Sequence, residues 1–120
     1  VFLAERCGEL MQDNIITDRT ILDVMAFTMN AKSIPHQDKE AFETYASEFV
    51  REYDYIFYIS PYGLEIEDNG VRETDEHYRD LIDFTITTLI KRHGHKAGTI
   101  EKISGSTEER IQQILNVTKL

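Results

Sequence analysis

Tyr53-Asp-Tyr-Ile-Phe-Tyr-Ile-Ser60 is the most apolar stretch of the sequence, and it indicates the fold class. Aromatic and β-branched residues make up most of it, and these residue types favour β-strands. Its apolar side chains occupy both odd and even positions, so both faces of the strand would be buried. The stretch therefore predicts a central β-strand that is covered on both sides and ends at Pro61.

The segments on either side of this stretch alternate between strand and helix patterns. Two weaker strands are expected at residues 14–18 and 98–103. Helices are expected before Asp13, from Thr20 onward, over about residues 37–53, over residues 78–93 and from Ser106 onward. This alternation predicts an α/β fold, a parallel sheet with helices on both faces. A central strand needs a neighbour at each edge, so we expect residues 1–120 to form a single, partial domain of a larger sheet.

The ends of the last two helices carry recognisable capping signals. Gly94 follows the helix over residues 78–93 and is expected at its C′ position, with His93 and His95 as capping residues beside it. Ser106-Thr-Glu-Glu109 has the spacing of a capping box and opens the final helix. The apolar residues expected to face inward from that helix are Ile111, Ile114, Leu115 and Val117.

The composition excludes several classes of function. The chain has 41% hydrophobic and 29% charged residues and a formal net charge of −9. Such a charge repels phosphate backbones, which argues against general nucleic-acid binding. No stretch reaches the roughly 20 apolar residues that span a bilayer, so no membrane partner is expected. Cys7 is the only cysteine, which excludes an intrachain disulfide and suggests a reducing, cytoplasmic location.

Polar residues follow the end of each predicted strand, where ligands gather in parallel α/β sheets. Asp18 and Arg19 come directly after the strand at residues 14–18. The carboxylate of Asp18 is suited to hold Mg²⁺ or to accept a substrate hydroxyl, and Arg19 is suited to pair with a phosphate. The alternative is that Asp18 only caps the following helix while Arg19 is solvated.

The second such segment is a polar loop over about residues 64–77, with Arg72 inside it and Arg79 just beyond. A mobile, arginine-bearing lid suits phosphoryl transfer because it excludes water and offsets charge. An ordinary acidic surface loop is one alternative. A calcium site is another, because several residues fall at ligand positions of an EF-hand loop: Glu65, Glu67, Asn69, Gly70 and Glu76. A glutamate at the first position and a strand before the loop count against calcium.

The third segment joins the last strand to the final helix. Gly105 lets the backbone approach a ligand, and Ser106 begins a helix whose N-terminus is electropositive. The alternative is an ordinary β–α turn with a good cap.

The order of these segments resembles that of small P-loop kinases. Residues Ile15–Phe27 resemble the "DR(S/T/Y)xxD/SxxAY" segment of thymidylate kinases and of the NadR-type (ribosylnicotinamide-kinase-like) AAA-domain ATPases. Residues Tyr53–Pro61 are similar to the following strand of the NadR-type group. Glu67–Arg72 looks like the "DDGxR" lid segment, and Gly105–Arg110 resembles the "GsxeeR" element. The resemblance covers nearly the whole chain and implies a P-loop NTPase fold of the nucleoside- or nucleotide-kinase type.

The resemblance also implies site residues and cofactors, namely ATP and Mg²⁺. Asp18 would lie near the metal ion and the acceptor, as a metal-shell ligand or a base, and Arg19 would contact substrate or phosphate. Arg72 and Arg79 would be lid arginines over the transferred phosphoryl group. The residues bordering the nucleotide base would be Gly105 and Ser106.

The family's phosphate-binding loop is missing from this sequence. No G-x-x-x-x-G-K-[ST] pattern occurs, so the first strand and the P-loop are expected in a missing N-terminal part of the same domain. We therefore expect the C-terminal part of an ATP-dependent phosphotransferase that acts on a nucleoside, nucleotide or related small metabolite, and no activity from these residues alone. The alternatives are a nucleotide-binding regulatory ATPase and an interaction module without phosphoryl transfer.

Overall fold

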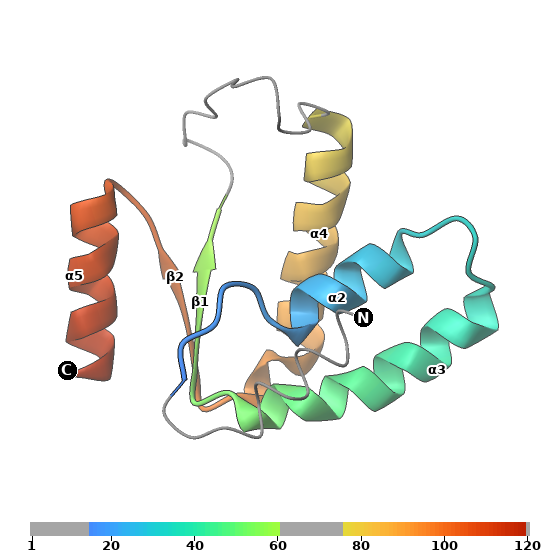
Figure 1. The fold of residues 1–120 in the computed structure, drawn as a ribbon, viewed down its shortest axis with the longest axis horizontal. Coiled ribbons are helices and arrows are strands. Elements are labelled where there is room, and N and C mark those ends of the chain that lie inside the picture. Colours follow the sequence, from blue (N-terminus) through green and yellow to red (C-terminus); the bar gives the residue numbers. More distant parts are fainter. Residues whose placement is uncertain (1–14, 61–75, 120) are drawn as a thin grey trace.

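The computed structural model describes residues 15–60 and 76–119. These residues form helices and strands in the order α2 (Ile21–Met29), α3 (His36–Ser47), the 3₁₀ helix η1 (Glu48–Glu52), β1 (Tyr55–Ile59), α4 (Glu76–His93), the 3₁₀ helix η2 (Gly94–Lys96), β2 (Thr99–Ile103) and α5 (Thr107–Thr118) (Figure 1). The helix expected before Asp13 and most of the lid loop, including Arg72, lie outside the described residues.

The sheet contains the two later predicted strands, β1 and β2. They pair in parallel, with Tyr55 opposite Thr99 and Ile59 opposite Ile103. Helix α4 makes the crossover connection that two parallel strands require. Figure 1 shows α5 on the opposite side of the strands from α2, α3 and α4. The described part of the chain is therefore an α/β arrangement around a small parallel sheet.

The prediction of a strand at residues 14–18 is wrong for residues 15–18, which are the ones that the structure describes. Residues 15–17 have no regular secondary structure, and the Ile16 side chain is 94% exposed. A strand needs a hydrogen-bonded neighbour, and within the described residues β1 pairs with β2 alone. The Thr17 hydroxyl instead donates to the carbonyl of Arg19 at 3.1 Å, and the chain turns there.

The prediction that β1 is covered on both faces is only partly confirmed. Side chains alternate along a strand, so Ile56 lies on one face and Tyr55 and Ile59 on the other. Ile56 is 5% exposed, whereas Tyr55 and Ile59 are 43% and 42% exposed. The core-facing side is buried by helices, and the side that faces α5 is only half covered.

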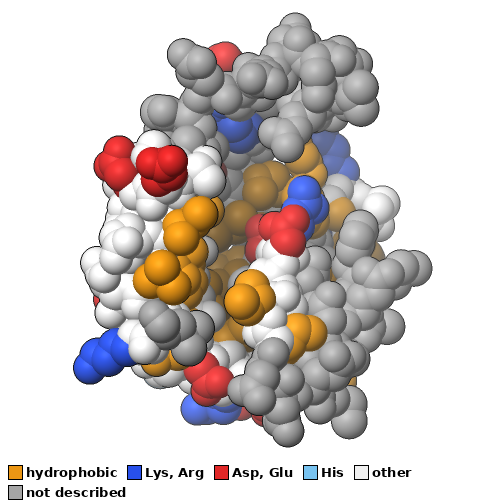
Figure 2. Space-filling view, turned by 60° about the vertical axis from the view of Figure 1, so that its left-hand side comes forward, with side chains coloured by type: hydrophobic (Ala, Val, Ile, Leu, Met, Phe, Trp, Pro, Cys, Tyr) orange, Lys and Arg blue, Asp and Glu red, His pale blue; other side chains and the backbone are white. Residues whose placement is uncertain are grey.

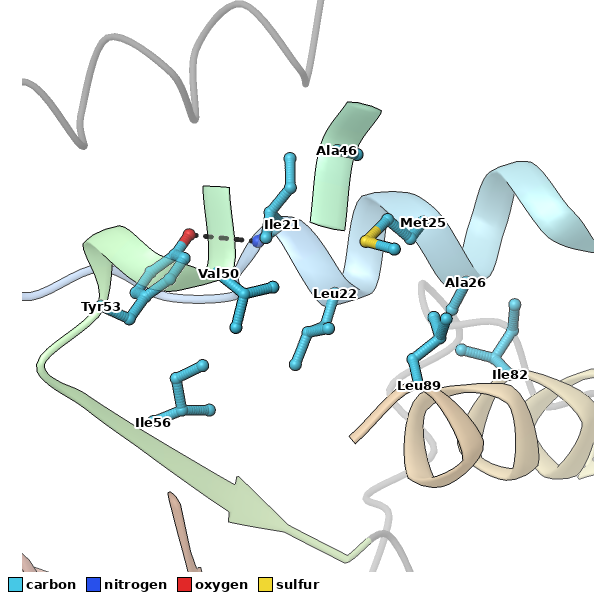
Figure 3. Close-up of a cluster of buried hydrophobic side chains, with 10 residues drawn as sticks. All are labelled: Ile21, Leu22, Met25, Ala26, Ala46, Val50, Tyr53, Ile56, Ile82 and Leu89. Carbon is cyan, nitrogen blue, oxygen red and sulfur yellow. Dashed lines mark hydrogen bonds between the residues drawn. The ribbon is translucent and has the colours of Figure 1, made fainter. Parts of the chain in front are cut away.

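One hydrophobic core lies between α2, α3, η1, β1 and α4 (Figure 3). Helix α2 contributes most to it, because four residues on one stripe are at most 2% exposed. Burying a large aliphatic side chain of this kind stabilises the fold by about 1.5–3 kcal/mol. The core residues are Ile21, Leu22, Met25, Ala26, Ala46, Val50, Tyr53, Ile56, Ile82 and Leu89. The helix predicted from Thr20 onward is thus confirmed.

Two helix starts are fixed by side-chain caps. The Thr20 hydroxyl accepts from Leu22 N at 3.1 Å, and the Asp23 carboxylate accepts from Thr20 N at 2.8 Å. This pair is a capping box, so the suggestion that Asp18 caps α2 is wrong. Ser106 caps α5 as predicted, with its hydroxyl accepting from Glu109 N at 3.1 Å.

Gly94 does not occupy the predicted left-handed C′ position. It begins the 3₁₀ helix η2, and Gly105, with φ of 99°, is the one described glycine with a positive φ. A Cβ atom at Gly94 would lie 2.8 Å from Cδ1 of Ile100. The absence of a side chain therefore lets the end of α4 pack closely against β2.

Helix α5 is less buried than its apolar stripe predicts. Ile111 and Leu115 are 51% and 39% exposed, and Ile114 and Val117 are only partly buried. The helix packs on the Ile103 side of β2, away from the main core. Figure 2, turned so that the α5 side comes forward, shows hydrophobic side chains around a hollow on this face. The four residues expected to face inward from α5 are thus only partly buried, or exposed, in the described part of the chain.

Candidate ligand site

The turn before α2 presents Asp18 and Arg19 on the surface. Both side chains are exposed, and Arg19 has a φ of 70°, in the left-handed region. A residue with a Cβ atom pays about 1–2 kcal/mol for that conformation. The hydrogen bond from Thr17 to the Arg19 carbonyl holds the turn. Backbone strain of this kind concentrates at ligand sites, which makes the turn the first candidate.

The guanidinium of Arg19 lies over an aromatic ring. Its Cζ atom is 5.9 Å from the centroid of the Phe27 ring, which extends from the last turn of α2 and is 38% exposed. A cation at an exposed site gains about 0.5–1 kcal/mol from this contact. Arg19 makes no ion pair with any residue that the structure describes, although acidic residues outnumber basic ones in the chain.

Helix α4 supplies a second ring to the same place. The Tyr78 ring centroid is 6.4 Å from that of Phe27, with the planes tilted by 32°, and Tyr78 is 39% exposed. Two segments separated in sequence therefore meet here, the turn with α2 and the start of α4, and we call the three side chains the Arg19–Phe27–Tyr78 cluster. The predicted residue Arg79 follows in the same turn of α4, where its Nη2 lies 3.6 Å from Oδ1 of Asp80.

A tyrosine–carboxylate pair joins β1 to α4 one turn further along that helix. The hydroxyl of Tyr58 donates to Oδ1 of Asp83, and both side chains are partly buried. The pair fixes the first half of α4, which carries Tyr78 and Arg79, against the sheet. Sequence reasoning missed Asp83 because its pairing with Tyr58 is a tertiary contact between residues 25 positions apart.

Gly105 and Ser106 lie at the end of β2, and their described contacts stay within the connection to α5. Ser106 caps α5, and a Cβ atom at Gly105 would lie 2.6 Å from Oε2 of Glu109. The Gln113 side chain bonds the backbone of Ser104 twice, at 3.2 Å and 2.7 Å. These bonds describe a well-capped β–α turn. Within the described residues, Gly105 and Ser106 are not part of the Arg19–Phe27–Tyr78 cluster.

The described residues contain no group of three or more His, Cys, Asp or Glu side chains placed to hold a metal ion. Asp18 is exposed and belongs to no such group. Of the calcium-loop positions only Glu76 is described, as the first residue of α4. Arg72 and the other loop positions lie outside the described residues.

A separate polar network ties the far end of α4 to α3. Glu43 accepts from Arg92 at 2.8 Å and lies 3.2 Å from Nε2 of His93. Lys96 reaches back to Ser47 at 3.0 Å. His93 is thus held by a carboxylate from another helix, and its predicted role as a simple helix cap omitted this contact.

Glu48 extends that network into η1. Arg51 lies 2.9 Å from Oε2 of Glu48, and Lys96 lies 3.3 Å from its Oε1. Hydrogen bonds from Arg51 and Lys96 hold the pKa of the Glu48 carboxyl below its ordinary value of 4.5. We assign the network a structural role, because each cation already faces a carboxylate or hydroxyl of the protein.

Comparisons with known proteins found no match. No protein-family model, curated protein or solved structure matches the chain. No helix in residues 15–60 or 76–119 is long and apolar enough to cross a membrane.

Proposed function

We propose that this chain is the C-terminal part of an ATP-binding phosphotransferase of the P-loop class, acting on a nucleoside, nucleotide or related small metabolite. The observation that carries the proposal is the Arg19–Phe27–Tyr78 cluster. Arg19, beside Asp18, contacts Phe27 of α2, and Phe27 in turn contacts Tyr78 at the start of α4, next to the predicted Arg79.

The chemistry of phosphoryl transfer agrees with such a cluster. The protein's main tasks in this reaction are to position the two substrates and to stabilise charge on the transferred group. The guanidinium of Arg19 has no carboxylate partner in residues 15–60 or 76–119, and such a group can meet a phosphate with two parallel hydrogen bonds. Asp18 beside it would hold Mg²⁺ through water or accept the acceptor's proton. Phe27 and Tyr78 add apolar area for the non-phosphate part of a ligand.

Other parts of the proposed site come from segments away from this cluster. Arg72 and Arg79 would close over the transferred phosphoryl group, and Gly105 and Ser106 would border the adenine. The loop that cradles the ATP phosphates would be supplied by a part of the polypeptide outside these 120 residues, because the sequence lacks its glycine–lysine pattern.

A transfer assay on the polypeptide that carries these residues tests the proposal. The γ-phosphate of ATP would be followed into a panel of nucleosides and nucleoside monophosphates, with Mg²⁺ present. We expect a phosphorylated product, and we expect its rate to fall at least about tenfold in Asp18→Asn and Arg19→Gln. Arg51→Gln is the matched control. It removes an exposed arginine of η1, outside the Arg19–Phe27–Tyr78 cluster, and should leave the rate unchanged.

Two results would count against the proposal. ATP binding without transfer to any acceptor would favour a regulatory ATPase. Absence of both ATP binding and transfer would leave an interaction module as the better account.

A further inference from the structure

Helix α5 carries apolar side chains that the described residues leave largely uncovered. Ile111 and Leu115 lie one turn apart and are 51% and 39% exposed, and α5 has no buried residue. On the sheet beside it, Ile59 lies opposite Ile103 in the strand register and is 42% exposed. Figure 2 shows hydrophobic side chains around a hollow on this side of the molecule. An apolar surface of this kind is typical of a contact with another protein or with a membrane.

Opposite charges lie at the two ends of this apolar stripe. Glu108, Ile111, Leu115 and Lys119 follow one another at spacings of three, four and four residues, which places them on one side of a helix. The N–H of Lys119 donates to the carbonyl of Leu115 at 2.8 Å, so Lys119 is still bonded to the last turn. Glu108 and Lys119 are exposed, and neither makes an ion pair with a described residue. We call these four residues the α5 face.

The α5 face is complementary to a second copy of itself in the antiparallel direction. The midpoint between Ile111 and Leu115 falls at residue 113, and the midpoint between Glu108 and Lys119 falls between residues 113 and 114. One two-fold axis at this point would therefore set Ile111 against the partner's Leu115. The same axis would set Glu108 against the partner's Lys119 at both ends of the contact.

The charge of α5 also favours a second copy over a membrane. Residues 107–119 carry two acidic and two basic side chains, Glu108, Glu109, Arg110 and Lys119, whereas the whole chain has a net charge of −9. Two copies can therefore approach each other at α5 with less repulsion than at the rest of the surface. A helix that lies on a membrane is usually rich in lysine and arginine on its polar face, and α5 has no such excess.

We propose that the α5 face is the contact surface of a homodimer, in which the α5 helices of two copies pack antiparallel about a two-fold axis. The apolar pair Ile111 and Leu115 forms the centre of the contact, and the Glu108–Lys119 pairs between the copies close its two ends. This inference goes beyond the proposed phosphotransferase function and does not depend on it. Figure 1 shows α5 on the opposite side of the strands from α2 and α4, which carry the Arg19–Phe27–Tyr78 cluster.

Sedimentation equilibrium of the polypeptide that carries these residues tests the dimer. We expect a monomer–dimer equilibrium, and we expect Ile111→Glu to weaken it at least about tenfold, because a carboxylate would be buried at the centre without a partner. Phe84→Glu adds the same charge at a 70% exposed ring of α4 and should dimerise as the parent does. Circular dichroism checks that both variants are folded. A monomer at every concentration, or a dimer that Ile111→Glu leaves intact, would overturn the proposal.

A charge exchange tests the antiparallel pairing. Glu108→Lys and Lys119→Glu should each weaken self-association about tenfold, because each sets like charges together at both ends of the contact. An equimolar mixture of the two variants should form a heterodimer in which both ion pairs are restored, at least about tenfold tighter than either variant with itself. Misfolding of either variant would not produce this rescue.

Two further variants are the controls for the charge exchange. Asp38→Lys and Lys32→Glu make the same charge changes at exposed positions in or next to α3, on the other side of the strands from α5. Both should dimerise as the parent does, alone and when mixed. A mixture of Glu108→Lys and Lys119→Glu that associates no more tightly than the single variants would contradict the antiparallel contact.

Discussion

The backbone N–H of Ile21 donates a 3.1 Å hydrogen bond to the hydroxyl of Tyr53, 32 residues further along the chain. The donor is one of the N–H groups that a helix leaves without an intrahelical partner, and here it is buried (Figure 3). Tyr53 lies two residues before the first residue of β1, so the bond ties the start of α2 to the start of the sheet. Because Arg19 lies two residues before Ile21, the same bond fixes the base of the candidate site.

Tyr53→Phe should therefore destabilise the fold by about 1–3 kcal/mol, because it leaves the N–H of Ile21 buried without an acceptor. The free energy of unfolding in urea measures the effect. Tyr45→Phe is the matched control, because Tyr45 is 60% exposed and its hydroxyl makes no hydrogen bond with any described residue. Equal stability of the two variants would show that the Tyr53 hydroxyl is dispensable.

Thr20→Ala should cost about 1 kcal/mol, the usual effect of losing an N-terminal cap. The variant removes the acceptor for Leu22 N and disrupts the reciprocal bond with Asp23. A thermal melt compares it with Thr44→Ala, which removes a hydroxyl that only bonds the carbonyl of Glu40 within α3. A melting temperature as high as that of Thr44→Ala would contradict the capping role.

Gly98→Ala should be poorly tolerated, because an added Cβ atom would lie 2.5 Å from the carbonyl oxygen of Asp54. That oxygen accepts from Thr99 N at 2.9 Å and helps to begin the pairing of β1 and β2. We expect a loss of about 1–3 kcal/mol, as for other overpacked sites. Gly94→Ala should cost less, because its new neighbour is the end of the flexible Ile100 side chain. The reverse order of unfolding free energies would contradict this account.

The Glu48 network should make stability depend on pH. Its contacts with Arg51 and Lys96 lower the pKa of Glu48 in the folded state below 4.5. The ionised carboxylate therefore stabilises the fold above pH 4.5, and this contribution is lost as the pH falls through the lowered value. Glu48→Gln should be less stable than the parent at pH 7, and the difference should shrink as the pH falls below 4.5.

Urea unfolding at pH 7 and at pH values below 4.5 measures this difference in stability. Added salt should reduce it because the Glu48–Arg51 pair is exposed. Glu52→Gln is the control, since Glu52 has no ion pair among the described residues. A difference in unfolding free energy between the parent and Glu48→Gln that increases at low pH would contradict the stabilising role of the ionised Glu48.

Local signals in the sequence were sufficient for much of the fold. The apolar run at Tyr55–Ile59, the cap at Ser106 and the stripe of α2 each predict their elements, because propensity, capping and packing agree there. The strand expected before Asp18 is wrong because a strand depends on its partner, which a short apolar pair cannot specify. Gly94 was misassigned because its packing against Ile100 is a tertiary contact.

The candidate site was only partly predictable for the same reason. Asp18, Arg19 and Arg79 stood out as polar residues beside strand and helix ends. Phe27 and Tyr78 did not, because aromatic residues on amphipathic helices are usually buried, and their exposure and contact depend on how α2 packs against α4. The order of segments predicted a ligand site at Asp18 and Arg19, and the structure adds the contacts with the Phe27 and Tyr78 rings.

Mg-ATP binding, measured by calorimetry, tests the central claim most directly. The polypeptide that carries a P-loop upstream of these residues should bind Mg-ATP, and residues 1–120 alone should bind it weakly or not at all. Asp18→Ala should reduce the dependence of binding on Mg²⁺. A polypeptide that has no P-loop and binds no nucleotide would contradict the phosphotransferase account.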